Sequence, residues 1–206
     1  MNKIIMLMLM LMWLSIFIQC QSQKKDKYMI PIVDNKYEKF DIENFQNKSV
    51  RGYLKVRENN NTYIQDFQSP GYREMIYNDN LFYKVTKFFY ENGNIEKKGC
   101  LFNEGSVAGI WYYFDKSGKI VKEENTDEGY EFKPEDIIVY CEKNKINLSK
   151  GYHDSGYQTR VLKQEFEGKK VWRISHQTSG DTIEEIILDG KTGKELQKKT
   201  VPFYNP

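Results

Sequence analysis

The chain has 206 residues, with 31 Lys and Arg against 29 Asp and Glu and a formal net charge of +2. This length allows one large domain or two small ones. The near balance of charge argues against nucleic acid as a partner. Two His and three Cys argue against a zinc site with several ligands. The 15 Tyr and 12 Phe favour β-structure over helical bundles. We therefore expect no metal, no cofactor and no nucleic-acid ligand.

The N-terminus resembles a secretory signal peptide. Lys3 supplies a positive charge, residues 4–18 are apolar apart from Ser15, and residues 21–27 are polar and charged. The apolar run is shorter than the roughly 20 residues that span a bilayer. Charge, apolar stretch and polar exit follow the order of a signal peptide. We expect an exported protein, in the periplasm or as an outer-membrane lipoprotein of a Gram-negative bacterium.

The sequence allows two alternative cleavage sites for the signal peptide. Cys20 directly follows the apolar run and resembles the lipid-attachment cysteine of bacterial lipoproteins, although Gln19 stands where that signal has a small residue. Cleavage there removes residues 1–19 and leaves a membrane tether, since each buried methylene adds about 0.8 kcal/mol of membrane affinity. Cleavage after Ser22 removes residues 1–22 and leaves no lipid anchor.

Export would place the other two cysteines, Cys100 and Cys141, in an oxidising compartment. Two alternatives stay open for them. A disulfide between them would close a loop of about 40 residues and stabilise the fold by roughly 3 to 4 kcal/mol. Otherwise, both are small buried apolar side chains with free thiols.

Residues 23–61 are expected to form an irregular N-terminal segment with short strands. Pro31 cannot donate to a central ladder, so residues 29–33 are typical of an edge segment. Residues 52–56 and 62–67 are predicted as two strands around a turn at 58–61.

An internal repeat follows. Residues 88–95 (FFYENGNI) are echoed by residues 112–120 (YYFDKSGKI), and Gly93 and Gly118 lie 25 positions apart. Each copy has aromatic residues, an acidic-polar turn ending in Gly and then a branched apolar residue. The Asn-Gly pair at the first turn favours a tight hairpin, because both residues tolerate positive φ. A period of this length is typical of a small supersecondary repeat.

These residues resemble the MORN-type repeats of bacterial exported proteins, in a variant that also occurs in antitoxin proteins. The family's Gly-x-Trp-x-Tyr-Tyr element stands here as residues 109–114 (GIWYYF), with Phe114 in place of the second Tyr. A degenerate third copy is expected at residues 71–80. The resemblance implies antiparallel β-hairpins joined in an elongated sheet over residues 62–130, and a repeat that carries no catalytic residue.

Residues 131–206 are expected to form a small α+β domain. Pro134 followed by Glu135 and Asp136 is typical of a helix start, because acids near the positive end of the dipole stabilise it. Strands are predicted at residues 162–166, 171–176 and 183–188. A helix followed by strands that end in the phrase DGKTGK resembles the PepSY-type domain of exported bacterial proteins. The expected fold class is therefore β-dominated α+β, with a hairpin sheet followed by a helix and a second antiparallel sheet.

No catalytic constellation is visible, and we predict that the protein is not an enzyme. Residues 190–193 (GKTG) lack the glycine spacing of a phosphate-binding loop. His153 and His176 lie in no recognisable nucleophile motif. A hydrolase would need a nucleophilic side chain next to a general base, and the sequence shows no such arrangement.

Aromatic side chains offer the best case for binding. Along a strand, Trp111 and Tyr113 face one side and Tyr112 the other, because side chains alternate. Together with Tyr90 they form the candidate binding surface, since exposed aromatic side chains are typical of interfaces. In the alternative, the N-terminal segment and the C-terminal domain cover both faces.

We thus expect an exported, non-enzymatic protein-interaction module with an unidentified protein partner. Its antitoxin-like or immunity-like form is implied by the family resemblance alone. The alternative is an inhibitor or regulator of an exported peptidase that acts through the PepSY-like part.

Overall fold

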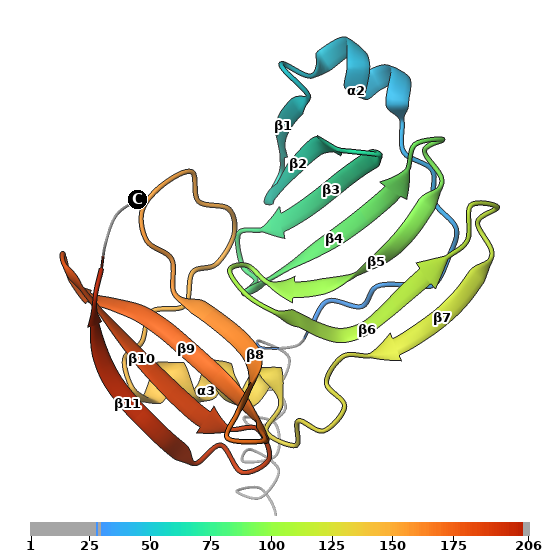
Figure 1. The fold of residues 1–206 in the computed structure, drawn as a ribbon. Coiled ribbons are helices and arrows are strands. Elements are labelled where there is room, and N and C mark those ends of the chain that lie inside the picture. The colour runs from blue at the N-terminus through green and yellow to red at the C-terminus, as the bar shows by residue number, and fades with distance from the viewer. Residues whose placement is uncertain (1–27, 29, 204–206) are drawn as a thin grey trace, which may run out of the picture.

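The computed structural model describes residues 28 and 30–203, and Figure 1 shows its fold. The expected signal peptide, both cleavage sites and Cys20 lie outside these residues. No described helix is long and apolar enough to span a bilayer.

Seven antiparallel strands form the first sheet, and each strand pairs with the next one along the chain. They are preceded by the short helix α2 (Ile42–Lys48). The strands are β1 (Tyr53–Glu58), β2 (Asn61–Gln68), β3 (Gly71–Asn78), β4 (Tyr83–Tyr90), β5 (Ile95–Phe102), β6 (Val107–Phe114) and β7 (Ile120–Asn125).

The second sheet has four antiparallel strands in the order β11-β10-β9-β8 and follows helix α3 (Pro134–Lys143). Its strands are β8 (Arg160–Phe166), β9 (Lys169–Ser179), β10 (Thr182–Asp189) and β11 (Glu195–Pro202). The expected fold class is confirmed: a hairpin sheet, then a helix, then a smaller antiparallel sheet.

The first sheet already begins at Tyr53, within the segment expected to be irregular. Strands β1 and β2 are the two strands predicted around the turn at residues 58–61. The two copies of the repeat are the hairpins β4–β5 and β6–β7. At their tips, Phe89 pairs with Ile95 and Phe114 with Ile120, so the 25-residue period is also a structural one.

One face of the seven-stranded sheet is covered by other parts of the chain. Residues 30–40, which we call the strap, cross behind the sheet in Figure 1 and lead into α2. Phe40 of the strap stacks on Tyr72 with ring centroids 4.7 Å apart, and Phe45 of α2 packs edge-on against the same ring at 5.6 Å. We call this the strap face and the opposite one the open face. Helix α2 was not predicted; Asp41 caps it by accepting a hydrogen bond from the Asn44 N–H.

The far end of the strap face packs against the second sheet. Tyr83, Phe102 and Ala108 belong to the same buried cluster as residues of α3 and of β8–β10. Trp172 of β9 lies at its centre, fully buried, with its ring 6.0 Å from that of Phe102. Residues expected to form two domains, 62–130 and 131–206, therefore share one hydrophobic core.

Polar contacts fix the same junction. The loop between β5 and β6 runs parallel to β8, where the Ser106 N–H donates to the Val161 carbonyl over 2.9 Å. Lys163 of β8 donates to the Asp127 carboxylate and lies 5.3 Å from the centre of the Trp172 ring. Since both side chains of this ion pair are about nine-tenths buried, it ties the end of the first sheet to the second.

Candidate functional site

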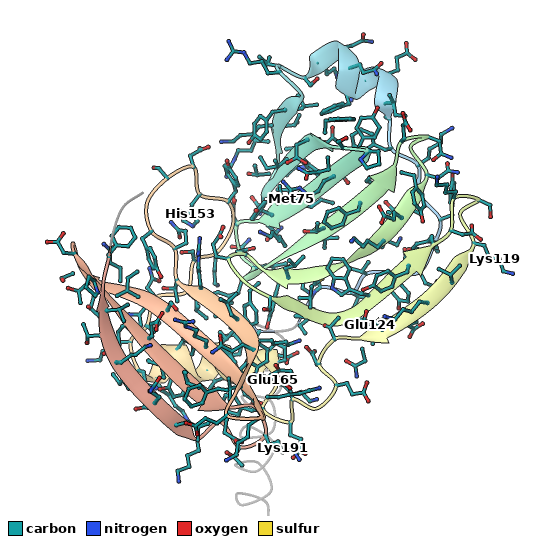
Figure 2. The ribbon with its side chains drawn as sticks, in the orientation of Figure 1. Met75, Lys119, Glu124, His153, Glu165 and Lys191 are labelled. Atoms are coloured by element: carbon teal, nitrogen blue, oxygen red, sulfur yellow. The ribbon has the colours of Figure 1, made fainter. Side chains whose placement is uncertain are left out.

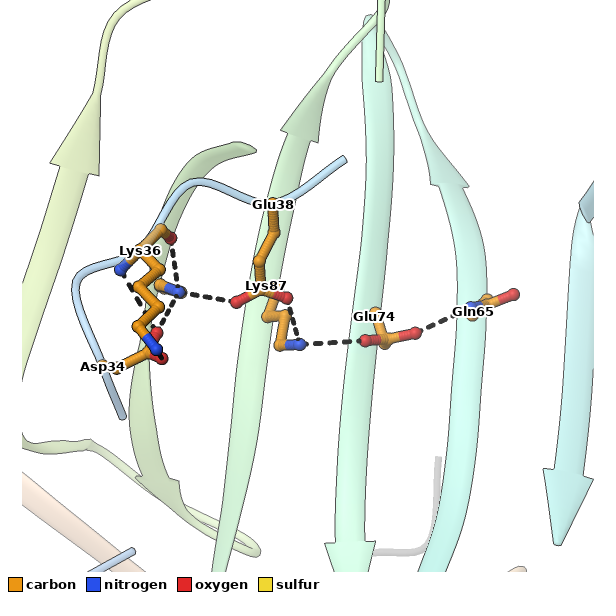
Figure 3. Close-up of polar contacts among 7 residues, drawn as sticks. Asp34, Lys36, Glu38, Gln65, Glu74 and Lys87 are labelled. Carbon is orange, nitrogen blue, oxygen red and sulfur yellow. Dashed lines mark hydrogen bonds and ion pairs between the residues drawn. The ribbon is translucent and has the colours of Figure 1, made fainter. Parts of the chain in front are cut away.

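A buried lysine holds the strap on its face of the sheet. The Lys98 side chain is fully buried, and its ammonium donates to Asp34 at 2.9 Å, the Lys36 carbonyl at 2.8 Å and Glu38 at 2.6 Å. All three of its protons are thus used. Figure 3 shows this cluster at one end of a longer polar row.

The row continues across the sheet from Glu38. The second oxygen of Glu38 accepts from Lys87, which also lies 3.5 Å from Glu74. Glu74 in turn accepts from the Gln65 amide over 2.7 Å. The two carboxylates of the strap therefore meet the same ammonium group, and Glu38 also binds a second lysine of the sheet.

Acid is expected to weaken the strap. Burial alone would raise the pKa of Glu38, but hydrogen bonds from Lys87 and Lys98 hold that pKa below its usual value of 4.5. A carboxylate with a lowered pKa in the folded state stabilises it above the unfolded value, and the stabilisation is lost as pH falls through the folded value. Urea unfolding at pH 7, 5 and 3 should show a steeper loss for the wild type than for Glu38→Gln. Parallel curves for the two proteins would contradict this assignment.

Partly exposed side chains line the open face, and neither α2 nor α3 packs on it. Figure 2 labels Met75 in its middle and Glu124 at its β7 edge. Along one border, Tyr152 packs edge-on against Tyr77 at 5.3 Å. Beside it, Lys55 pairs with Asp154 at 2.7 Å.

A row of alternating cations and aromatic rings crosses the open face. Each member stands directly opposite the next one on the neighbouring strand. The members are Arg73, Phe88, Lys97, Tyr113 and Lys122, from β3 to β7, and Asp66 of β2 stands opposite Arg73 at the end of the row. We call this the cation–aromatic row.

The row follows from the repeat. The ammonium of Lys97 lies 4.6 Å from the centre of the Phe88 ring, and that of Lys122 lies 4.9 Å from the centre of the Tyr113 ring. The two pairs are related by the same 25-residue shift as the hairpin tips. Cation–aromatic contacts of this kind contribute about 0.5–1 kcal/mol at exposed sites.

The cations of the row differ in their partners. Arg73 is paired with Asp66, and Lys122 with Glu124 at 2.9 Å. Among the described residues, no carboxylate lies within ion-pair distance of Lys97. Lys97 is therefore the cation of the row that has no ion-pair partner among the described residues.

Beside the cation–aromatic row, the open face also has side chains that are almost completely buried. Ile64, Thr86 and Trp111 are 2%, 3% and 4% exposed, and Met75 is half-buried. The Thr86 hydroxyl has no hydrogen-bond partner among the described residues. The Trp111 indole lies flat over Gly99 and donates to the Cys100 carbonyl over 3.0 Å.

Gly99→Ala is expected to displace Trp111. A Cβ at this position would lie 2.4 Å from three atoms of the indole ring, so the ring must move, and its hydrogen bond to the Cys100 carbonyl is expected to weaken. Overpacking of this kind costs about 1–3 kcal/mol. Urea unfolding followed by tryptophan fluorescence measures the loss. Gly180→Ala, where nothing lies within 4 Å of the added carbon, is the matched control; equal stability of the two variants would contradict this packing.

The four aromatic residues of the candidate binding surface separate between the faces. Tyr90, Trp111 and Tyr113 lie on the open face, whereas Tyr112 packs against the buried cluster of the strap face. The Tyr90 hydroxyl donates to the Phe114 carbonyl over 2.7 Å, and that of Tyr113 to Glu124 over 2.6 Å. Trp111 is too buried to offer much contact area.

The two described cysteines are free, so the disulfide alternative is not realised. The Cys100 thiol donates to the Pro31 carbonyl of the strap over 3.2 Å, while Cys141 packs in the core shared by the two sheets. Burial raises the pKa of each thiol to about 12, which leaves both protonated at neutral pH.

Sequence reasoning missed the cations of the open face. Their signal was nevertheless present: Lys97 follows Phe88, and Lys122 follows Tyr113, by nine positions each. In a hairpin with a short turn, this spacing places the two residues opposite each other.

The chain was compared with known proteins at three levels. No family model matches it, and no curated protein or solved structure is significantly similar to it. Among the described residues, no three or more His, Cys, Asp or Glu side chains gather where they could hold a metal ion. Since no relative indicates a functional site, the candidate site rests on the arrangement of the side chains on the open face.

Proposed function

We propose that the chain is a non-enzymatic protein-binding module whose binding surface is the open face of the seven-stranded sheet. The observation that carries this proposal is the asymmetry of the sheet. The chain's own strap and α2 cover one face, whereas the other keeps the cation–aromatic row partly exposed. Aromatic residues and arginine are enriched where proteins bind one another.

The proposal includes export, on the strength of the N-terminal sequence. The module would act in the cell envelope, with or without a lipid tether at Cys20. An antitoxin-like or immunity-like role fits the same surface, because neutralising a partner requires binding and no chemistry.

Site-specific photo-crosslinking tests the choice of face. A photoreactive phenylalanine analogue replaces Phe88 on the open face or, as the control, Phe67, which is 52% exposed on the strap face. In the producing cells, we expect one saturable adduct from position 88, competed by excess unlabelled protein, and none from position 67. Adducts from position 67 alone, or adducts that excess protein does not compete, would overturn the proposal.

A further inference from the structure

We infer that the open face receives an extended, proline-containing acidic segment of the partner, with a carboxylate at every third residue. This inference rests on the proposed function and names the chemistry of the partner. Three features of the molecule support it: the charge of the face, the spacing of the row and the way the chain binds its own strap.

The charge of the face selects an acidic partner. Lys97 has no ion-pair partner among the described residues; Lys84 donates to the Asn103 carbonyl and the Tyr77 hydroxyl, with the Glu104 carboxylate acting on its charge from a greater distance. Asp66 and Glu124 compensate the outer cations, Arg73 and Lys122. A segment with few carboxylates fits this balance better than a nucleic-acid backbone, which carries a negative charge at every nucleotide.

The spacing of the row selects an extended segment. Arg73, Lys97 and Lys122 stand on alternate strands, so successive cations are roughly 9.6 Å apart at about 4.8 Å per strand. In a polyproline II segment, residues three apart lie on one side at roughly 9.3 Å. A carboxylate that pairs with Lys97 would therefore place the next ones, three residues away on either side, beside Arg73 and Lys122, where they would compete with Asp66 and Glu124. The residues between them would meet the rings of Phe88 and Tyr113, since aromatic side chains are the usual platform for such segments.

The strap shows the same mode of binding on the other face. There an irregular segment lies across β4 and β5 and reaches their lysines with its two carboxylates, Asp34 and Glu38, although its own two lysines leave it without net charge. An aromatic side chain of that segment, Phe40, enters a cluster of rings on the sheet. The open face offers lysines and rings from the same hairpins, without a segment of the described chain across them.

Peptide titrations test the inference. The probes are labelled fifteen-residue peptides of the repeated triplet Glu-Pro-Pro and of its neutral counterpart Gln-Pro-Pro, with a single-stranded DNA of equal length. Fluorescence anisotropy should show the acidic peptide binding at least about tenfold more tightly than the neutral one, because the charges meet at a partly desolvated surface.

Single substitutions should change this affinity in opposite directions. Lys97→Gln removes the unpaired cation, and we expect binding of the acidic peptide to weaken by about threefold to tenfold. Glu124→Gln releases Lys122 from its partner, and binding should tighten by about twofold or more. Lys39→Gln, an equal charge change on the exposed side of the strap, should leave the affinity unchanged.

Three outcomes would overturn the inference. The first is no binding of the acidic peptide. The second is equal binding of acidic and neutral peptides without effect of Lys97→Gln. The third is tighter binding of the DNA. The crosslink from position 88 decides the proposed function separately, so a competed protein adduct with a failed peptide titration would reject only the acidic segment.

Discussion

Replacing Lys98 by methionine is expected to lower the free energy of unfolding by about 3 kcal/mol, because it removes the buried cation that pairs with both Asp34 and Glu38. Methionine keeps the length of the side chain and removes the three hydrogen bonds to the strap. Urea unfolding measures the loss. Limited proteolysis by trypsin, which cuts after lysine, should then cleave the variant at Lys36 or Lys39 more rapidly than the wild type.

The matched control for this variant is the same substitution at the neighbouring residue, Lys97→Met. Lys97 points to the open face, where its ammonium meets the Phe88 ring and no carboxylate among the described residues. Lys97→Met should therefore change stability by about 0.5–1 kcal/mol or less. Equal losses for the two variants would contradict the assignment of the two lysines to opposite faces.

Trp172→Ala is expected to cost about 3–5 kcal/mol and to destabilise both sheets together. The side chain is fully buried, its indole N–H donates to the Phe132 carbonyl over 2.9 Å, and its ring contacts Phe102 of the first sheet. Because the core is shared, thermal unfolding of the wild type should be one transition, and that of the variant one transition at lower temperature.

The control for this second variant is Leu196→Ala on β11, where the leucine is 38% exposed and only a small loss is expected. Two separate transitions in the wild type, or a loss for Trp172→Ala no larger than for Leu196→Ala, would contradict a shared core. Deleting residues 134–206 should, for the same reason, uncover Tyr83 and Phe102 and yield insoluble protein.

Local signals explain how much of the fold could be predicted. The turn glycines Gly93 and Gly118 have φ values of 82° and 89°, so the residue type that marks these turns is also required by their backbone. Alternation along β6 correctly assigned Tyr112 and Tyr113 to opposite faces.

Long-range contacts explain the rest. The strap has no periodic pattern, and its place depends on Lys98, more than sixty positions from Asp34. The residue type alone would not predict that Lys98 is buried, because charged side chains are normally exposed. The shared core likewise depends on how β8 meets the loop between β5 and β6, which no local pattern of residues indicates.

The candidate site was predictable in part. Its aromatic residues are visible in the repeat, but Tyr112 was grouped with them, although it stands opposite Lys98 on the strap face. The cations were missed although their nine-residue spacing from the rings is in the sequence, because the register of β4 to β7 decides which ring each lysine meets.

One measurement tests the central claim most directly. Met75 lies in the middle of the open face, so its ¹³C-labelled methyl group, assigned with Met75→Leu, reports on that surface. The partner identified by crosslinking at position 88 is titrated into the labelled protein while the methyl resonance is recorded. We expect the Met75 signal to shift or broaden until the partner saturates the protein. A complex that forms while the Met75 signal stays unchanged would contradict binding at the open face.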